Sequence, residues 1–245
     1  MMQLFLPLFK REFFGYFRSP VAYVFIVIFL LASSGCTFFL SRLYESNQAS
    51  LDGFFGILPW LFLVLVPAVG MRLWAEERHS GTIELLFTLP VNMFTAVFAK
   101  YMAALSFLVI NLMLTFPIVI TVNYLGHPDN GVILISYFGS ILLAGSCLSI
   151  SCLTSALTKN QVVSFILGVM ITFLLVLLGW GVFTNVLAAI LPIAIVDMIT
   201  SLGLIPHYTA ITRGVVDSRD VIYFVLLSGA SLVLTAIVLE LKKEG

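Results

Sequence analysis

Six long stretches without a charged side chain set the limits on how this sequence can fold. Each is long enough, at about 1.5 Å of rise per helical residue, to cross a hydrocarbon layer of roughly 30 Å. The mean hydropathy of +1.13, with 61% hydrophobic and only 10% charged residues, excludes a soluble globular protein. The chain is therefore predicted to be an all-α integral membrane protein, with a single transmembrane domain over 1–245. The uncharged stretches are 19–41, 53–71, 101–128, 130–158, 160–196 and 221–239.

Polar turns and helix breakers divide these stretches into six predicted spans. Pro20 suits the first turn of a helix, and the turn from His127 to Gly131 and the pair Lys159-Asn160 separate later spans. Lys100, near the start of the third span, is expected to extend its ammonium group to the surface. The spans are predicted at about 20–41, 53–72, 98–125, 132–157, 161–182 and 221–240.

The uncharged stretch 160–196 is too long for one ordinary crossing, since it would measure about 55 Å as a helix. Gly179 to Gly181 and Pro192 interrupt it. We therefore predict one or two short helices over 184–206, re-entrant or interfacial, that enter the outer leaflet without crossing it. A polar piece over 207–220 precedes the last span, and its charged residues, Arg213, Asp217, Arg219 and Asp220, are predicted to form a solvated outer loop in preference to a binding site.

The first 18 residues mix Leu and Phe with basic side chains. At about 100° per residue, Gln3, Lys10, Arg11 and Arg18 fall on one arc of a helix. Such an amphipathic helix is predicted to lie in the membrane interface. A basic flank that merely anchors the first span is an equally open alternative.

Lysine and arginine residues divide unevenly between the two sides of a six-span chain. Nine lie on the side of both termini and three on the other, so the positive-inside rule places both termini in the cytoplasm of a bacterial inner membrane. A seventh crossing through 184–206 would instead place Lys242 and Lys243 outside. The nine are Lys10, Arg11, Arg18, Arg72, Arg78, Lys100, Lys159, Lys242 and Lys243, and the three are Arg42, Arg213 and Arg219.

The connection between the second and third spans, over 72–100, is far longer than a simple turn needs. It gathers charges from Glu76 to His79 and continues into a predicted two-turn helix from Thr82 to Leu89. Nearly all side chains of that helix are apolar, and burying four large ones would contribute roughly 1.5–3 kcal/mol each. Docking onto a partner protein is favoured over lying on the membrane, because interfacial helices are usually rich in Lys and Arg.

The segment E-E-R-x-S-G-T-I-E-L-L-x-T-L-P-V at 76–91 resembles the cytoplasmic coupling segment of ABC-2 type permeases, the membrane subunits of ABC exporters. The likeness is to the branch containing gliding-motility-associated and nitrous-oxide-maturation permeases. Shorter likenesses at 18–20, 59–60, 67–72 and 213–221 extend the resemblance over nearly the whole chain. In that family the segment seats in a separate ATP-binding subunit and transmits nucleotide-driven closure to the membrane helices.

The resemblance also implies partners and site residues. The expected partners are a cytoplasmic ABC ATPase subunit, a second permease copy (the same chain or a related one), membrane lipids, and a periplasmic or membrane accessory protein, with no nucleic acid. ATP and Mg²⁺ would bind to the ATPase subunit, and no cofactor, metal or catalytic residue is expected in this chain. The docking residues carried over by position are Glu76, Glu77, Arg78, Gly81, Thr82, Glu84, Leu85, Leu86, Leu89 and Pro90.

Other functions lack their usual motifs. No G-x-x-x-x-G-K-[ST] sequence is present, so ATP hydrolysis would have to come from another polypeptide. The three cysteines have no C-x-x-C spacing, and no predicted span contains a histidine, which argues against a metal site and an intramembrane enzyme.

An ion- or proton-coupled carrier or channel that acts without an ATPase is the alternative function. Such a carrier would need ionisable residues at mid-membrane, and the predicted spans have none there. The predicted function is therefore a permease subunit that couples a partner's ATP hydrolysis to export or extrusion. The uncharged spans permit a lipid, a peptide, a polysaccharide or no cargo at all.

Small residues concentrate in the fourth predicted span. Gly145 and Ser149, and likewise Ser151 and Ser155, are four residues apart, the spacing that lets helices approach closely. Close helix packing is favoured over a hydroxyl-lined substrate path.

Overall fold

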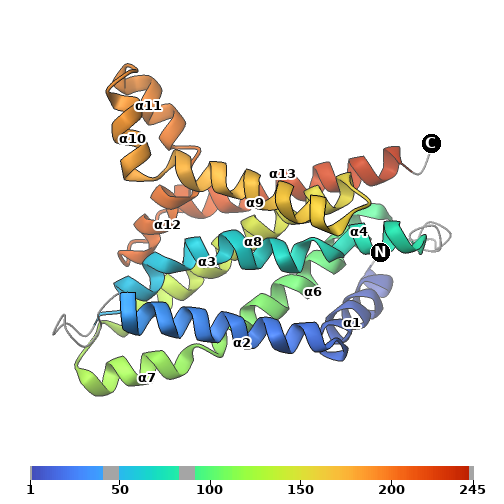
Figure 1. Cartoon of the computed structure of the whole chain (residues 1–245), viewed down its shortest axis with the longest axis horizontal. Helices are drawn as coiled ribbons and strands as arrows, with labels where there is room; N and C mark the ends of the chain where they lie inside the picture. The colour runs from blue at the N-terminus through green and yellow to red at the C-terminus, as the bar shows by residue number, and fades with distance from the viewer. Residues whose placement is uncertain (1, 41–49, 83–91, 243–245) are drawn as a thin grey trace.

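The protein is a bundle of helices, and the computed structural model describes residues 2–40, 50–82 and 92–242. Within these ranges no strand is present (Figure 1). Among the described residues, six helices are long and apolar enough to cross a membrane. The predicted all-helical membrane fold is therefore confirmed.

The six candidate spans overlap the predicted ones, and the second and third exceed the predicted lengths by the largest margins. The second span stays helical to Ser80, whereas the sequence predicted its end near 72, and the third begins at Met93 instead of 98. The elements are α2 (Pro20–Gly35) with the π-helix η1 (Cys36–Leu40), α3 (Asp52–Gly70) with α4 (Arg72–Ser80), α6 (Met93–Met113) with α7 (Phe116–Leu125), α8 (Asn130–Leu157), α9 (Gln161–Leu178) and α13 (Ser218–Leu241).

Side-chain caps explain where several of these helices begin. A short polar side chain accepts a hydrogen bond from a backbone N–H group of the first turn, which has no partner inside the helix. Pro20, directly after the cap of α2, loses nothing by lacking an N–H there. The capping residues are Ser19 for α2, Asn92 for α6, Asp129 for α8, Asn160 for α9 and Asp217 for α13.

Helix α8 runs through the middle of the bundle and contacts α3, α4, α6, α9, α12 (Leu204–Thr212) and α13 (Figure 1). Its small residues face these neighbours: a Cβ atom on Gly139 would lie 2.7 Å from Ile211, and one on Gly145 would lie 2.8 Å from the Tyr101 hydroxyl. The predicted close packing of this span is confirmed. Its buried hydroxyls bond mostly to backbone carbonyls, as Ser146 does to Phe224 at 3.2 Å.

Two glycines of α3 provide a direct test of this close packing. A Cβ atom on Gly70 would collide with Ser151 of α8, whereas one on Gly56 would meet nothing within 4 Å. We expect Gly70→Ala to destabilise the protein by about 1–3 kcal/mol through overpacking. Gly56→Ala is the control and should be neutral or stabilising, because alanine favours the helix. Thermal unfolding in detergent would measure both, and equal effects would contradict close α3–α8 contact.

Three short helices precede the last span, where one or two were predicted. They are α10 (Gly181–Ala188), α11 (Ile193–Thr200) and α12, and a bend of 72° separates α11 from α12. Helices α10 and α11 project from one end of the bundle (Figure 1). That these short helices do not cross the membrane remains a prediction from the sequence.

The prediction of a solvated loop is wrong for Asp220, and the polar piece that starts at 207 begins inside a packed helix. Helix α12 continues to Thr212, and Tyr208 is buried, with its hydroxyl 3.1 Å from the Phe55 carbonyl oxygen. Asp220 is buried beside His207, whose Nδ1 lies 2.7 Å from the carboxylate. The polar composition suggested exposure, but His207 and Asp220 satisfy each other across the α12–α13 contact, and Tyr208 bonds to α3.

Candidate functional site

Helix α4 carries the charged cluster that the sequence placed between the second and third spans. It follows α3 after a break at Met71 and ends at Gly81, whose φ of 73° is in the left-handed region that favours glycine. Ser80 and Thr82 cap this end, because the Ser80 hydroxyl donates to the Glu76 carbonyl at 2.9 Å and also contacts the Thr82 hydroxyl. The residues from Glu76 to His79 are therefore helical, a continuation of the second span.

The predicted two-turn helix lies almost entirely outside the described residues. Gly81 and Thr82 are described and exposed. The remaining predicted docking residues of that segment fall within 83–91, which the structure does not describe: Glu84, Leu85, Leu86, Leu89 and Pro90.

A serine from α8 fills the break between α3 and α4. The backbone N–H groups of Trp74 and Ala75 donate to the Ser155 hydroxyl oxygen at 3.0 and 2.9 Å, and this hydroxyl donates to the Met71 carbonyl at 2.8 Å. One hydroxyl thus uses its donor and both acceptor positions on backbone groups that a continuous helix would pair internally. These hydrogen bonds consequently hold the α3–α4 break against the end of α8.

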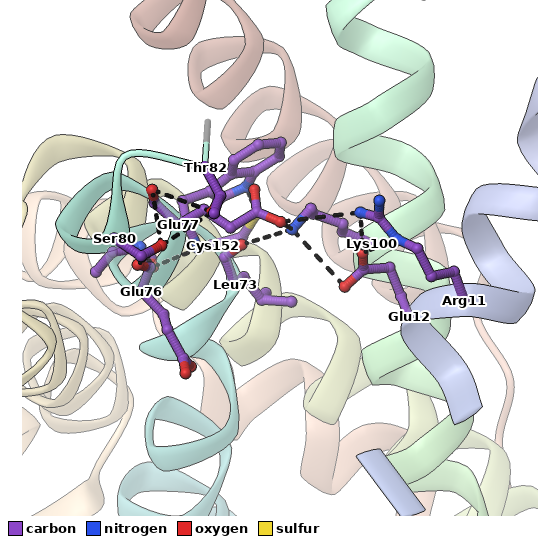
Figure 2. A network of polar contacts seen from close by, with 12 residues as sticks. Arg11, Glu12, Leu73, Glu76, Glu77, Ser80, Thr82, Lys100 and Cys152 are labelled. Atoms are coloured by element: carbon purple, nitrogen blue, oxygen red, sulfur yellow. Dashed lines mark hydrogen bonds and ion pairs between the residues drawn. The ribbon is translucent and has the colours of Figure 1, made fainter. Parts of the chain in front are cut away.

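Lys100 of α6 lies at the meeting point of α1 (Met2–Arg18), α4 and α6 (Figure 2). Its ammonium is 2.6 Å from Glu77 Oε1, 3.7 Å from Glu12 Oε2 and 3.1 Å from the Leu73 carbonyl oxygen. The same ammonium lies 4.8 Å from the centre of the Trp74 ring. Only 4% of the side chain is exposed, so the prediction that Lys100 reaches the surface is wrong. Acceptors from α1 and α4 compensate the burial of this ammonium.

Helix α1 supplies the outer part of this ion-pair network. The Arg11 guanidinium lies 2.7 Å from Glu12 and 3.9 Å from Glu77, and the hydrogen-bonded Glu12 carboxylate raises the pKa of Arg11. Aromatic contacts hold α1 along α6, among them Tyr16 stacked on Phe107 with ring centres 5.1 Å apart. The helix predicted for this segment is thus present, with its predicted interfacial residues exposed: Lys10, Arg11 and Arg18. Its position in the membrane interface stays a prediction.

Arg78 binds within the chain, at the end of α8. Its guanidinium donates to the carbonyl oxygens of Ala156 at 2.7 Å and Thr158 at 3.4 Å. Lys242 donates to the carbonyls of Ala156 and Leu157 at 3.0 and 2.9 Å. Two cations at a helix C-terminus satisfy carbonyls that lack intrahelical partners and oppose the negative end of the helix dipole. Burial, followed by the charges of Arg78 and Lys159, lowers the pKa of Lys242.

The docking residues predicted from sequence thus divide into two groups where the structure describes them. Glu76, Gly81 and Thr82 are exposed at the end of α4, whereas Glu77 and Arg78 hold α4 to α6 and α8. Sequence reasoning missed Glu12 entirely and assigned Ser155 only to close helix packing. The isolated position of Lys100, between two long uncharged segments, could have suggested a buried and paired cation.

These features define a helical membrane protein whose second span extends beyond the apolar region into a braced, charged helix. Residues 8–179 match the family described as ABC-2 family transporter protein, and the chain therefore belongs to the ABC-2 transporter family. It is a permease subunit of an ABC transporter. This family is the membrane component without an ATPase domain of its own, and it generally acts with a separate ATP-binding subunit. No match was found among curated proteins.

Proposed function

We propose that the end of α4 and the segment that follows it, over 76–91, form the docking site for a separate cytoplasmic ATPase subunit, and that the chain exports or extrudes its substrate across the inner membrane. ATP and Mg²⁺ bind to that subunit, and this chain holds no cofactor. The observation that supports docking here is that α4 continues a membrane span and ends in exposed residues, Glu76, Gly81 and Thr82, beside the motif shared with ABC-2 permeases.

The contacts of α4 suggest how a movement of the ATPase subunit is transmitted to the membrane helices. Ser155 couples the α3–α4 break to α8, and the Glu77–Lys100 ion pair couples α4 to α6. Arg11 and Glu12 extend the connection to α1. Displacement of α4 therefore acts on three other helices at one end of the bundle and changes the path between two permease copies.

The proposal keeps the remaining expectations from the sequence. Both termini lie in the cytoplasm, a second permease copy completes the transporter, and lipids with a periplasmic or membrane accessory protein are further partners. The relationship to the branch of gliding-motility-associated and nitrous-oxide-maturation permeases also remains a prediction from the 76–91 motif.

The double variant Glu84→Arg with Leu86→Asp tests the docking site. A reversed charge and a buried carboxylate in the contact should weaken copurification of the ATP-binding subunit at least about tenfold and abolish its permease-stimulated ATPase activity in liposomes. The matched control is Glu240→Arg with Leu241→Asp, which places the same changes on two exposed residues at the end of α13. Undiminished coupling in the first variant would contradict docking, and transport by the chain alone would favour the carrier alternative.

A further inference from the structure

A cavity of about 660 Å³ opens beside the ion-pair network. It lies between α1, the first turns of α2, the α3–α4 junction and α6. Helix α4 and the joint of α1 with α2 are at the same end of the bundle (Figure 1). The volume is within the range typical of small-molecule sites.

Two arginines of the cavity lining have no ion-pair partner among the residues that the structure describes. Four cations line the cavity, and two of them, Arg11 and Lys100, are paired with Glu12 and Glu77 as described above. Arg18 and Arg72 also line the cavity, and neither forms an ion pair or side-chain hydrogen bond with any residue that the structure describes.

The carboxylates of the cavity do not cancel these two charges. The third carboxylate in the lining is Glu76, which is exposed and points away from Lys100 (Figure 2). Across the described lining, four cations stand against three carboxylates, so the cavity keeps a positive excess. A guanidinium presents donors in a planar fork that matches two oxygens of a phosphate.

Part of the cavity wall is apolar. Val21, Ala22 and Phe25 of α2 line it together with Ala68 and Val69 of α3. These residues belong to two candidate membrane spans, and Val21 is 47% exposed. Unpaired cations thus adjoin an apolar surface at the ends of spans, where lipid headgroups meet their acyl chains.

We propose that this cavity binds one glycerophospholipid, with its phosphate held by Arg18 and Arg72 and an acyl chain against the α2–α3 wall. A soluble phosphate compound offers the same charge but would leave the apolar wall uncovered. The proposal does not depend on ATPase docking, because it uses only the described residues of this chain and the membrane that surrounds the spans.

Native mass spectrometry of the full-length chain, delipidated in detergent, would test the site. Phosphatidylglycerol and phosphatidylethanolamine should bind, whereas diacylglycerol, which lacks the phosphate, should bind at least about tenfold more weakly. Inorganic phosphate and glycerol 3-phosphate should not displace the lipid at equal concentration. Arg18→Ala with Arg72→Ala should weaken phospholipid binding by about tenfold or more, and Arg18→Lys with Arg72→Lys should retain most of it.

The control is Arg213→Ala with Arg219→Ala, which removes two exposed arginines from the opposite end of the spans and should leave binding unchanged. Unchanged binding in the Arg18/Arg72 alanine variant, or an equal loss in the control, would overturn the site. Equal competition by inorganic phosphate would instead identify a soluble anion as the ligand and overturn the lipid proposal. The wild-type comparison of phosphatidylglycerol with diacylglycerol needs no variant, so it decides the question even if the alanine variant does not fold.

Discussion

Replacing Lys100 with Met is expected to destabilise the protein by about 2–4 kcal/mol. The change keeps an unbranched side chain but removes the buried cation that Glu77 and Glu12 share, and leaves them only the exposed Arg11 as a partner. Breaking a buried ion pair costs about 3–5 kcal/mol, and the lower estimate applies because both carboxylates keep 21% exposure. The free energy of unfolding in detergent micelles would be measured by chemical denaturation.

Two comparisons separate the ion pair from a general effect of removing a lysine. Lys159→Met removes an exposed lysine at the same end of the bundle and should change stability by less than about 0.5 kcal/mol. Combining Glu77→Gln with Lys100→Met also neutralises the Glu77 carboxylate. The double variant should therefore recover part of the free energy of unfolding that Lys100→Met loses. If the Lys100→Met protein is as stable as the Lys159→Met control, the ion-pair network contributes nothing to the free energy of unfolding.

The spans were predictable because a bilayer leaves the backbone few choices. A long uncharged segment must pair its own N–H and C=O groups, and a helix does so without help from other parts of the chain. The N-termini of α2 and α9 are also predictable, because Ser19-Pro20 and Asn160 are local signals for the start of a helix. These arguments need only residues that are neighbours in sequence.

The length of the second span was not predictable in the same way. A run of charges such as Glu76 to His79 normally marks where a helix leaves the membrane for an irregular connection. Here Glu77 is neutralised by Lys100 and Arg78 is bound by the end of α8, and both partners lie far away in sequence. The helix therefore continues to Ser80 for reasons that no local pattern contains.

The candidate site also combines a feature that local sequence predicts with contacts that depend on residues distant in sequence. The motif at 76–91 identified the region, while the residues that brace it, Glu12, Lys100 and Ser155, come from three other helices. Ser155 in particular was read as a small residue for close packing. Its hydroxyl has a second role that depends on a break in another helix, which the sequence does not reveal.

That role makes Ser155→Ala the sharpest test of how α4 is held. The change leaves the buried N–H groups of Trp74 and Ala75, and the partly buried carbonyl of Met71, without their partner. An unsatisfied buried backbone group costs about 1–3 kcal/mol, and partial rearrangement of the break should limit the total to about 2–4 kcal/mol. Hydrogen exchange at the Trp74 and Ala75 amides should accelerate, because their bonds are the ones removed.

Ser149→Ala is the matched control on the same helix. Ser149 is as deeply buried as Ser155, but its hydroxyl donates only to the Ser146 carbonyl one turn earlier, at 2.8 Å. Its loss should leave unfolding and the exchange of the α4 amides nearly unchanged, since that carbonyl belongs to a continuous helix. If both variants behave alike, the α3–α4 break is stable without its serine, and movement of α4 has no direct hydrogen-bonded path into α8.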